Sequence, residues 1–144
     1  MTAIAAPLEC IVDISATPET VWTFWTDPAR LCEWWGIEAE LVAQPGGVFR
    51  VVMQEGTAVM CGEYLELDPP RRLVFSFGWE GNLPSGPLPP GSTRVEVTLT
   101  PEGGGTRLVL RHYDLPEAAV PDHSTGWRYF VGERMVELAK RNAS

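Results

Sequence analysis

The side chains that could perform chemistry are few in this sequence of 144 residues. It contains two histidines, His112 and His123, and neither has a second histidine or a carboxylate at an interval typical of metal ligands. We therefore expect both to be hydrogen-bonded or solvent-facing side chains. The sequence predicts no metal site and no cofactor.

The three cysteines, Cys10, Cys32 and Cys61, lie far apart and form no C-x-x-C pair. They indicate small, partly buried side chains rather than a disulfide framework, a zinc knuckle or a catalytic thiolate. The motifs G-x-S-x-G and H-E-x-x-H and a P-loop lysine are absent. The glycines at 103–105 precede a predicted strand, which indicates a turn and not a phosphate cradle. No catalytic residue is assigned.

Aromatic side chains could instead line a binding pocket. Six tryptophans are a high number for a chain of this length, and a buried indole needs a partner for its N–H group. Either they fill the core and seal the joint between helices and sheet, or Trp35, Trp79 and Trp127 help to wall an apolar pocket. The polar residues that could add specificity to such a pocket are Tyr64, Arg94, His112, Tyr113, His123 and Tyr129.

These side chains are positioned by a chain that begins with a strand and two short helices. Residues 8–14 alternate between apolar and polar, which favours a half-buried strand. A hydroxyl cap within residues 15–17 before Pro18, and a capping Thr26 or Asp27 before Pro28, then predict two short helices. The loop at 80–91 is either an ordinary connection or a lid. Further strands are predicted at 37–42, 48–53, 58–67, 73–79, 92–100 and 106–112.

The last predicted element is a long amphipathic helix. It is expected to begin near residues 122–124, any of which could cap it, and to end near Arg141. Gly126 and Gly132 lie inside it, where a glycine costs about 1 kcal/mol, so close packing or room beside a ligand must explain them. The apolar residues that recur at intervals of three and four are Trp127, Phe130, Val131, Met135 and Leu138.

This order of elements predicts an α+β fold in which six or seven antiparallel strands are covered on one face by the terminal helix. Residues 1–144 are expected to form one domain. If alternation is kept along the sheet, one face points toward the helix and forms either packed core or the lining of a cavity. The residues expected to bind a ligand there are Trp35, Tyr64, Phe75, Phe77, Trp79, Val95, Val97, Leu108, Leu110, Trp127 and Phe130.

Composition and charge exclude several classes of partner. The formal net charge is −8, from 11 Lys and Arg against 19 Asp and Glu, so nucleic acid and anionic membrane surfaces would be repelled. No stretch of the sequence is apolar and long enough for a membrane span, and the N-terminus does not resemble a signal peptide. A cytoplasmic location is expected.

Six strings of the sequence, taken in order, resemble a known superfamily. They are Thr17 to Trp22, Thr26 to Trp35, Pro45 to Arg50, Gly62 to Phe75, Gly104 to Leu108, and His123 to Trp127. Together they resemble the START-like (SRPBCC) superfamily, in the single-domain branch named after the activator of the heat-shock chaperone ATPase. The resemblance implies a helix-grip fold, in which a curved antiparallel sheet grips a long C-terminal helix around an apolar cavity. It also implies a small apolar, aromatic or lipid-like ligand and a link to the stress response.

Two other functions stay open beside ligand binding without catalysis. One is an interaction module that contacts a heat-shock chaperone through its acidic surface, although the chaperone activator itself resembles a larger protein with an additional N-terminal domain. The other is a cyclase or hydrolase that uses the same cavity, for which His112, Tyr64 and Glu63 are the candidate acid-base groups. The sequence indicates neither a particular ligand nor an oligomeric state.

Overall fold

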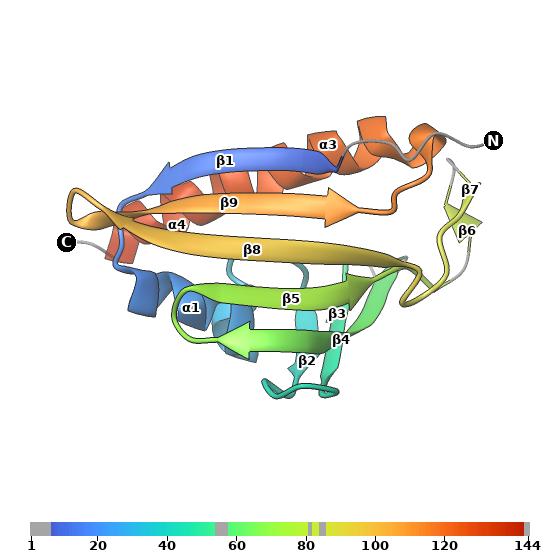
Figure 1. The fold of residues 1–144 in the computed structure, drawn as a ribbon, viewed down its shortest axis with the longest axis horizontal. Helices are drawn as coiled ribbons and strands as arrows, with labels where there is room; N and C mark the ends of the chain where they lie inside the picture. Colours follow the sequence, from blue (N-terminus) through green and yellow to red (C-terminus); the bar gives the residue numbers. More distant parts are fainter. Residues whose placement is uncertain (1–6, 54–57, 81, 84–85, 143–144) are drawn as a thin grey trace.

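The computed structural model describes residues 7–53, 58–80, 82–83 and 86–142. Within them, one antiparallel sheet has the strand order β1-β9-β8-β5-β4-β3-β2 (Figure 1). Its strands are β1 Leu8–Ile14, β2 Glu38–Leu41, β3 Val48–Val52, β4 Val59–Asp68, β5 Arg72–Phe77, β8 Thr93–Glu102 and β9 Gly105–Tyr113. The predicted α+β fold and its antiparallel sheet are confirmed.

Two short helices follow the first strand, as the sequence predicts. They are α1, Pro18–Thr26, and α2, Pro28–Leu31. Each begins with a proline, whose missing N–H has no intrahelical partner in any case. The hydroxyl of Thr17 accepts a hydrogen bond from the backbone N–H of Thr20, and the carboxylate of Asp27 caps α2 in the same way.

The C-terminal helix is long and continuous but contains a wider π-helical turn. A 3₁₀ turn precedes it. The segments are the 3₁₀ turn Glu117–Ala119, α3 Val120–Tyr129, the π-helical segment Phe130–Met135 and α4 Val136–Asn142. The predicted start near residues 122–124 was wrong by two to four positions. No side chain caps α3; instead Pro121 in its first turn and the preceding 3₁₀ turn start the helix.

The face of the sheet that is expected to point toward the helix does so, because Phe77 at the end of β5 lies 5.8 Å from Trp127 of α3. Phe75 pairs with Val95 and Leu73 with Val97, while Val97 pairs with Leu110 on the next strand. All five of these side chains are buried. Paired residues on neighbouring strands share a face, so the alternation holds across β5, β8 and β9.

The loop at 80–91 contains a short hairpin that the sequence does not predict. Asn82–Leu83 forms β6 and Gly86–Pro87 forms β7. Strands this short need few ladder hydrogen bonds, so neighbouring prolines do not prevent them. The lid interpretation also involves residues 81 and 84–85, which lie outside the described residues. The end of this segment is fixed, because the backbone N–H of Trp79 donates to the carbonyl oxygen of Leu88 over 2.7 Å.

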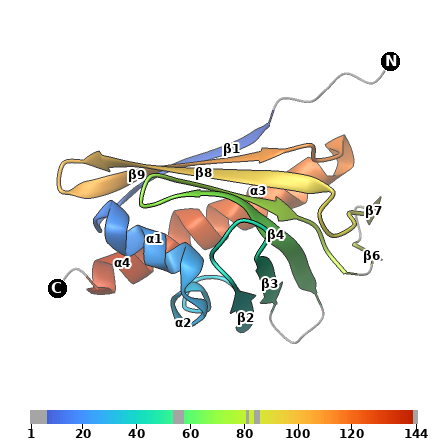
Figure 2. The ribbon, with the colours of Figure 1, turned by 60° about the horizontal axis from the view of Figure 1, so that its bottom comes forward.

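The sheet curves around the long helix, and α1 and α2 lie on the same side of the sheet as that helix (Figure 2). The buried apolar side chains lie between these layers. This arrangement is the predicted helix grip. Among the described helices, none combines the length and apolarity that crossing a membrane requires.

Candidate ligand-binding cavity

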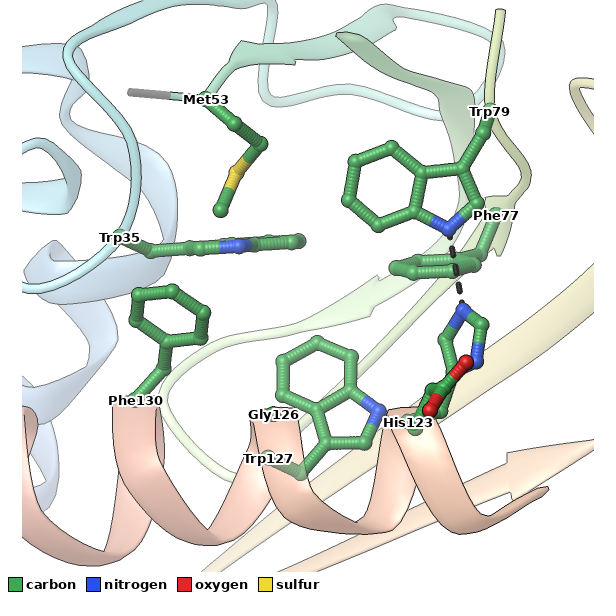
Figure 3. Close-up of a pocket in the computed structure, with 9 residues that line it drawn as sticks. Trp35, Met53, Phe77, Trp79, His123, Gly126, Trp127 and Phe130 are labelled. Atoms are coloured by element: carbon green, nitrogen blue, oxygen red, sulfur yellow. Dashed lines mark hydrogen bonds between the residues drawn. The ribbon is translucent and has the colours of Figure 1, made fainter. Parts of the chain in front are cut away.

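A cavity of about 220 Å³ lies between the long helix and the end of β5. Its wall is mostly aromatic, and part of that wall is half-buried or exposed, so the cavity opens to solvent. The described residues that line it are Trp35, Met53, Phe77, Trp79, Asp122, His123, Gly126, Trp127 and Phe130 (Figure 3).

Phe77 is the ring that connects the aromatic walls. Its centroid lies 5.5 Å from that of Trp79, 5.8 Å from that of Trp127 and 6.3 Å from that of Trp35. Trp35 also contacts Trp127, at 5.2 Å. In Figure 3, Met53 and these rings surround a central space. Separations of this size are typical of aromatic pairs in contact.

The residue just after Trp35 has a backbone conformation that requires glycine. Gly36 has a φ of +81°, a conformation that side chains with a Cβ rarely adopt. A Cβ at this position would also collide with the side chain of Val51. Trp35 itself is held from behind by Trp34, whose ring is stacked on it at 5.5 Å. Glycine is therefore required here by both conformation and space.

One face of the long helix forms the lower wall of the cavity in Figure 3. His123, Gly126, Trp127 and Phe130 follow one another at helical spacing, so their side chains lie on the same face. A Cβ added to Gly126 would meet no atom within 4 Å. This glycine therefore leaves open the space that a larger residue would fill.

The indole of Trp79 is held by His123. The Trp79 Nε1–H group donates to Nε2 of His123 over 3.0 Å, and Nδ1–H of His123 donates to the carbonyl oxygen of Ala119 over 2.8 Å. Burial lowers the pKa of His123, although the bond to Ala119 and the carboxylate of Asp122 oppose this shift. The imidazole is therefore neutral, which leaves Nε2 free to accept the indole proton.

The indole of Trp127 is held by the other histidine. Its Nε1–H group donates to Nδ1 of His112 over 3.1 Å, so Nε2–H of His112 donates to the hydroxyl of Thr93 over 2.8 Å. The Thr93 hydroxyl in turn donates to the carbonyl oxygen of Phe77 over 2.8 Å. Burial, and then the neighbouring His123, lower the pKa of His112 to about 3. A protonated His112 could no longer accept from Trp127.

Of the eleven residues expected to bind a ligand, five line the cavity: Trp35, Phe77, Trp79, Trp127 and Phe130. The other six are buried in the core and do not line it. These are Tyr64, Phe75, Val95, Val97, Leu108 and Leu110. The eleven residues that the sequence analysis groups together therefore fall into two groups, five around the cavity and six in the packed core.

Four of the lining residues were not among the eleven expected to bind a ligand. Two of them had been considered for other reasons: His123 as a polar residue that could add specificity, and Gly126 as a position that leaves room beside a ligand. Both share the helical face of Trp127 and Phe130. Asp122 precedes this face, and Met53 follows the last residue of β3. No local pattern of the sequence distinguishes Met53 from a packed core residue.

The candidate acid-base groups of an enzyme lie elsewhere. Tyr64 is buried, and its hydroxyl donates to the carbonyl oxygen of Trp25 over 2.8 Å; burial raises its pKa. His112 is completely buried, and Glu63 is exposed on β4. None of these three groups lines the cavity. In the described part of the chain, no cluster of three or more His, Cys, Asp or Glu side chains could hold a metal ion.

A curved antiparallel sheet around a long C-terminal helix, with a cavity between them, defines the START-like (SRPBCC) class of protein. Within this class, the chain belongs to the family described as Activator of Hsp90 ATPase homolog 1-like protein, whose model matches residues 15–140. Among proteins of curated function, none matches the chain in sequence.

Several solved structures resemble the chain. The AHSA1-like protein RHE_CH02687 from Rhizobium etli is 35% identical, with a TM-score of 0.69 over 92% of this chain and 81% of that one. CalU16 from Micromonospora echinospora is 30% identical, with a TM-score of 0.68 over 94% and 79%. DynU16, a protein in the dynemicin biosynthetic locus, is 26% identical, with a TM-score of 0.76 over 93% of this chain. The chain spans 47% of the length of DynU16.

Proposed function

We propose that this protein binds a small aromatic or apolar molecule in the cavity between the sheet and the long helix. The observation that carries the proposal is a cavity of about 220 Å³ whose wall contains five aromatic side chains. Concave sites with mostly apolar walls and a few polar groups are the usual form of small-molecule sites. Here His123 and Asp122 are the polar groups.

The size of the cavity limits the ligand. A dry apolar cavity of about 150 Å³ accommodates benzene, so this one suits a molecule of one or two rings. Burial of roughly 300 Å² of apolar surface would contribute about 7 kcal/mol before the cost of association. Micromolar affinity is therefore within reach with little polar contribution.

One structural neighbour supports a small organic ligand. DynU16 is described as a protein in the dynemicin biosynthetic locus, which is a locus for the synthesis of an organic molecule. Trp35, Phe77 and Trp127 belong to the buried core, but they also border a space that a fully packed core would not leave.

Native mass spectrometry and a neutral probe would test the proposal. We expect a small molecule to co-purify, or naphthalene to bind with micromolar affinity and to quench the tryptophan fluorescence. Gly126→Leu should reduce binding at least tenfold, because its side chain would project into open space in the cavity. Gly132→Ala is the matched control on the same helix, since its Cβ would make an ordinary contact with Val12.

Two results would overturn the proposal. The first is an apo mass together with the absence of naphthalene binding by the wild-type protein. The second is naphthalene binding that Gly126→Leu leaves unchanged while the variant unfolds at the same urea concentration as the wild type, because the probe would then bind outside the cavity.

A further inference from the structure

The wall of the cavity is rich in aromatic rings. Five aromatic rings line it, and the face of an aromatic ring carries partial negative charge that attracts a cation within about 6 Å. Tryptophan is the strongest of the aromatic residues in this respect, and three of the five rings are tryptophans.

Two of the tryptophans direct their hydrogen-bond donors away from a ligand. The Nε1–H group of Trp79 is used by His123 at 3.0 Å, and that of Trp127 by His112 at 3.1 Å. Both imidazoles accept these protons in their neutral form. A ligand that needs a donor, such as a carboxylate or a phosphate, would find these two N–H groups already occupied.

The charge at the cavity has one sign. Among the described lining residues, Asp122 carries a carboxylate and none is Lys or Arg. Asp122 is close enough to His123 to oppose the lowering of the imidazole pKa by burial, so the charge of Asp122 acts on this side of the helix. The net charge of −8 adds a long-range field that attracts cations.

From these features we propose that the cavity selects a compact organic cation, such as an alkylammonium or arylammonium group, over neutral and anionic molecules of the same shape. This inference rests on the proposed function and specifies the class of its ligand. The aromatic rings contact the apolar substituents and stabilise the positive charge, and Asp122 lies at the rim.

A neighbouring hollow contains a basic residue. Met53 and Phe130 line both this hollow and the cavity and therefore separate the two. Arg134 lines the hollow, where its guanidinium donates to the carbonyl oxygen of Glu33 over 3.2 Å. An anionic group would have to bind there, outside the aromatic wall.

The test compares three probes by isothermal titration calorimetry. Phenyltrimethylammonium and tert-butylbenzene have the same shape and differ in a positive nitrogen against a carbon, while benzenesulfonate supplies a negative charge. We expect the cation to bind about tenfold more tightly than its carbon isostere, and benzenesulfonate to bind most weakly.

Two charge-neutralising variants assign the effect to the cavity. Asp122→Asn should weaken binding of phenyltrimethylammonium about two- to threefold and leave tert-butylbenzene unchanged, because an exposed carboxylate is largely screened by solvent. Glu133→Gln removes the same charge from an exposed residue of the same helix that does not line the cavity, so it should change neither affinity.

The outcomes separate this inference from the proposed function. Equal or tighter binding of tert-butylbenzene would overturn the cation preference while supporting an apolar site. Tightest binding of benzenesulfonate would overturn it as well and would direct attention to Arg134. If no probe binds, the cavity is not a site for such molecules and both proposals fail.

Discussion

Two aromatic clusters lie on the same side of the sheet and differ in how they are held together. The packed cluster contains Trp25, Trp34, Phe49, Tyr64 and Phe75, which are all completely buried. Its closest pairs are Phe49 and Phe75, stacked at 4.1 Å, and Trp25 and Trp34, at 4.7 Å, while Trp25 and Phe75 lie 6.0 Å apart. Around the cavity, the contacting pairs among Trp35, Phe77, Trp79 and Trp127 lie 5.2 to 6.3 Å apart.

The clusters also differ in how the N–H groups of their tryptophans are satisfied. In the packed cluster, the Nε1–H group of Trp34 donates to the carbonyl oxygen of Phe24 over 2.9 Å, but the buried Nε1–H group of Trp25 has no hydrogen-bond partner among the described residues. At the cavity, Trp79 and Trp127 each donate to a neutral histidine. Close packing can orient a ring even when one donor is unsatisfied, whereas a ring beside open space needs a hydrogen bond to fix it. Two of the rings beside the cavity are thus fixed by a histidine, whereas the indole of Trp25 is fixed by packing alone.

The largest expected effect comes from truncating one phenylalanine in each cluster. Phe75→Ala should lower the free energy of unfolding by about 3 to 5 kcal/mol, because it leaves a void in a tightly packed region. Phe130→Ala should lower it by only about 1 to 2 kcal/mol, because this half-buried ring already borders open space. Urea unfolding followed by circular dichroism measures both values.

Both substitutions replace a phenylalanine with alanine, so the two losses of stability can be compared directly. Equal losses of stability would mean that the cavity is closed by packing in solution, and the distinction between the clusters would then disappear. The urea dependence of the unfolding free energy should be the same in both variants, which shows that the same unfolded state is compared.

The second largest expected effect is a pH dependence of the free energy of unfolding, caused by the histidines that accept hydrogen bonds from Trp79 and Trp127. The pKa of His112 is lowered from 6.5 to about 3, so between these values the unfolded chain binds a proton that the folded chain does not. The free energy of unfolding should therefore fall as the pH falls, by about 2 kcal/mol from pH 7 to pH 5 for His112. His123, whose pKa is also lowered, should add to this slope in the same direction.

His112→Gln tests the assignment, because glutamine is polar but does not titrate. The variant should be less stable than the wild type at pH 7, and its stability should change less between pH 7 and pH 5. If the variant keeps the full slope of the wild type, protonation of His112 is not the cause.

The sequence predicts most of the fold because its signals are local. Alternation identifies the strands, and the capping residues Thr17 and Asp27 identify the short helices. Two features could not be predicted in this way. The register shift in β4 between Tyr64 and Glu66 depends on its pairing with β5, and the helix starts at Val120 without a side-chain cap.

The candidate site could be predicted only in part. An aromatic side chain on the helix-facing side of the sheet produces the same sequence pattern whether its neighbour is a residue or an empty space. What decides between them is the residue opposite, and at the cavity this is Gly126. The histidine partners of Trp79 and Trp127 are 44 and 15 residues away in the sequence, so no local pattern shows these pairs.

The smallest expected effect compares two glycines of the long helix. Gly126→Ala and Gly132→Ala should each raise the free energy of unfolding by about 0.5 to 1 kcal/mol, because alanine favours a helix and neither Cβ would collide with a neighbour. Only Gly126→Ala removes space from the cavity, so it alone should weaken naphthalene binding, measured by fluorescence titration. Equal binding by both variants would show that the space beside Gly126 is not where the probe lies. A loss of stability in Gly126→Ala would mean that this part of the cavity closes in solution. The rings beside Gly126 would then be packed as closely as those of the packed cluster.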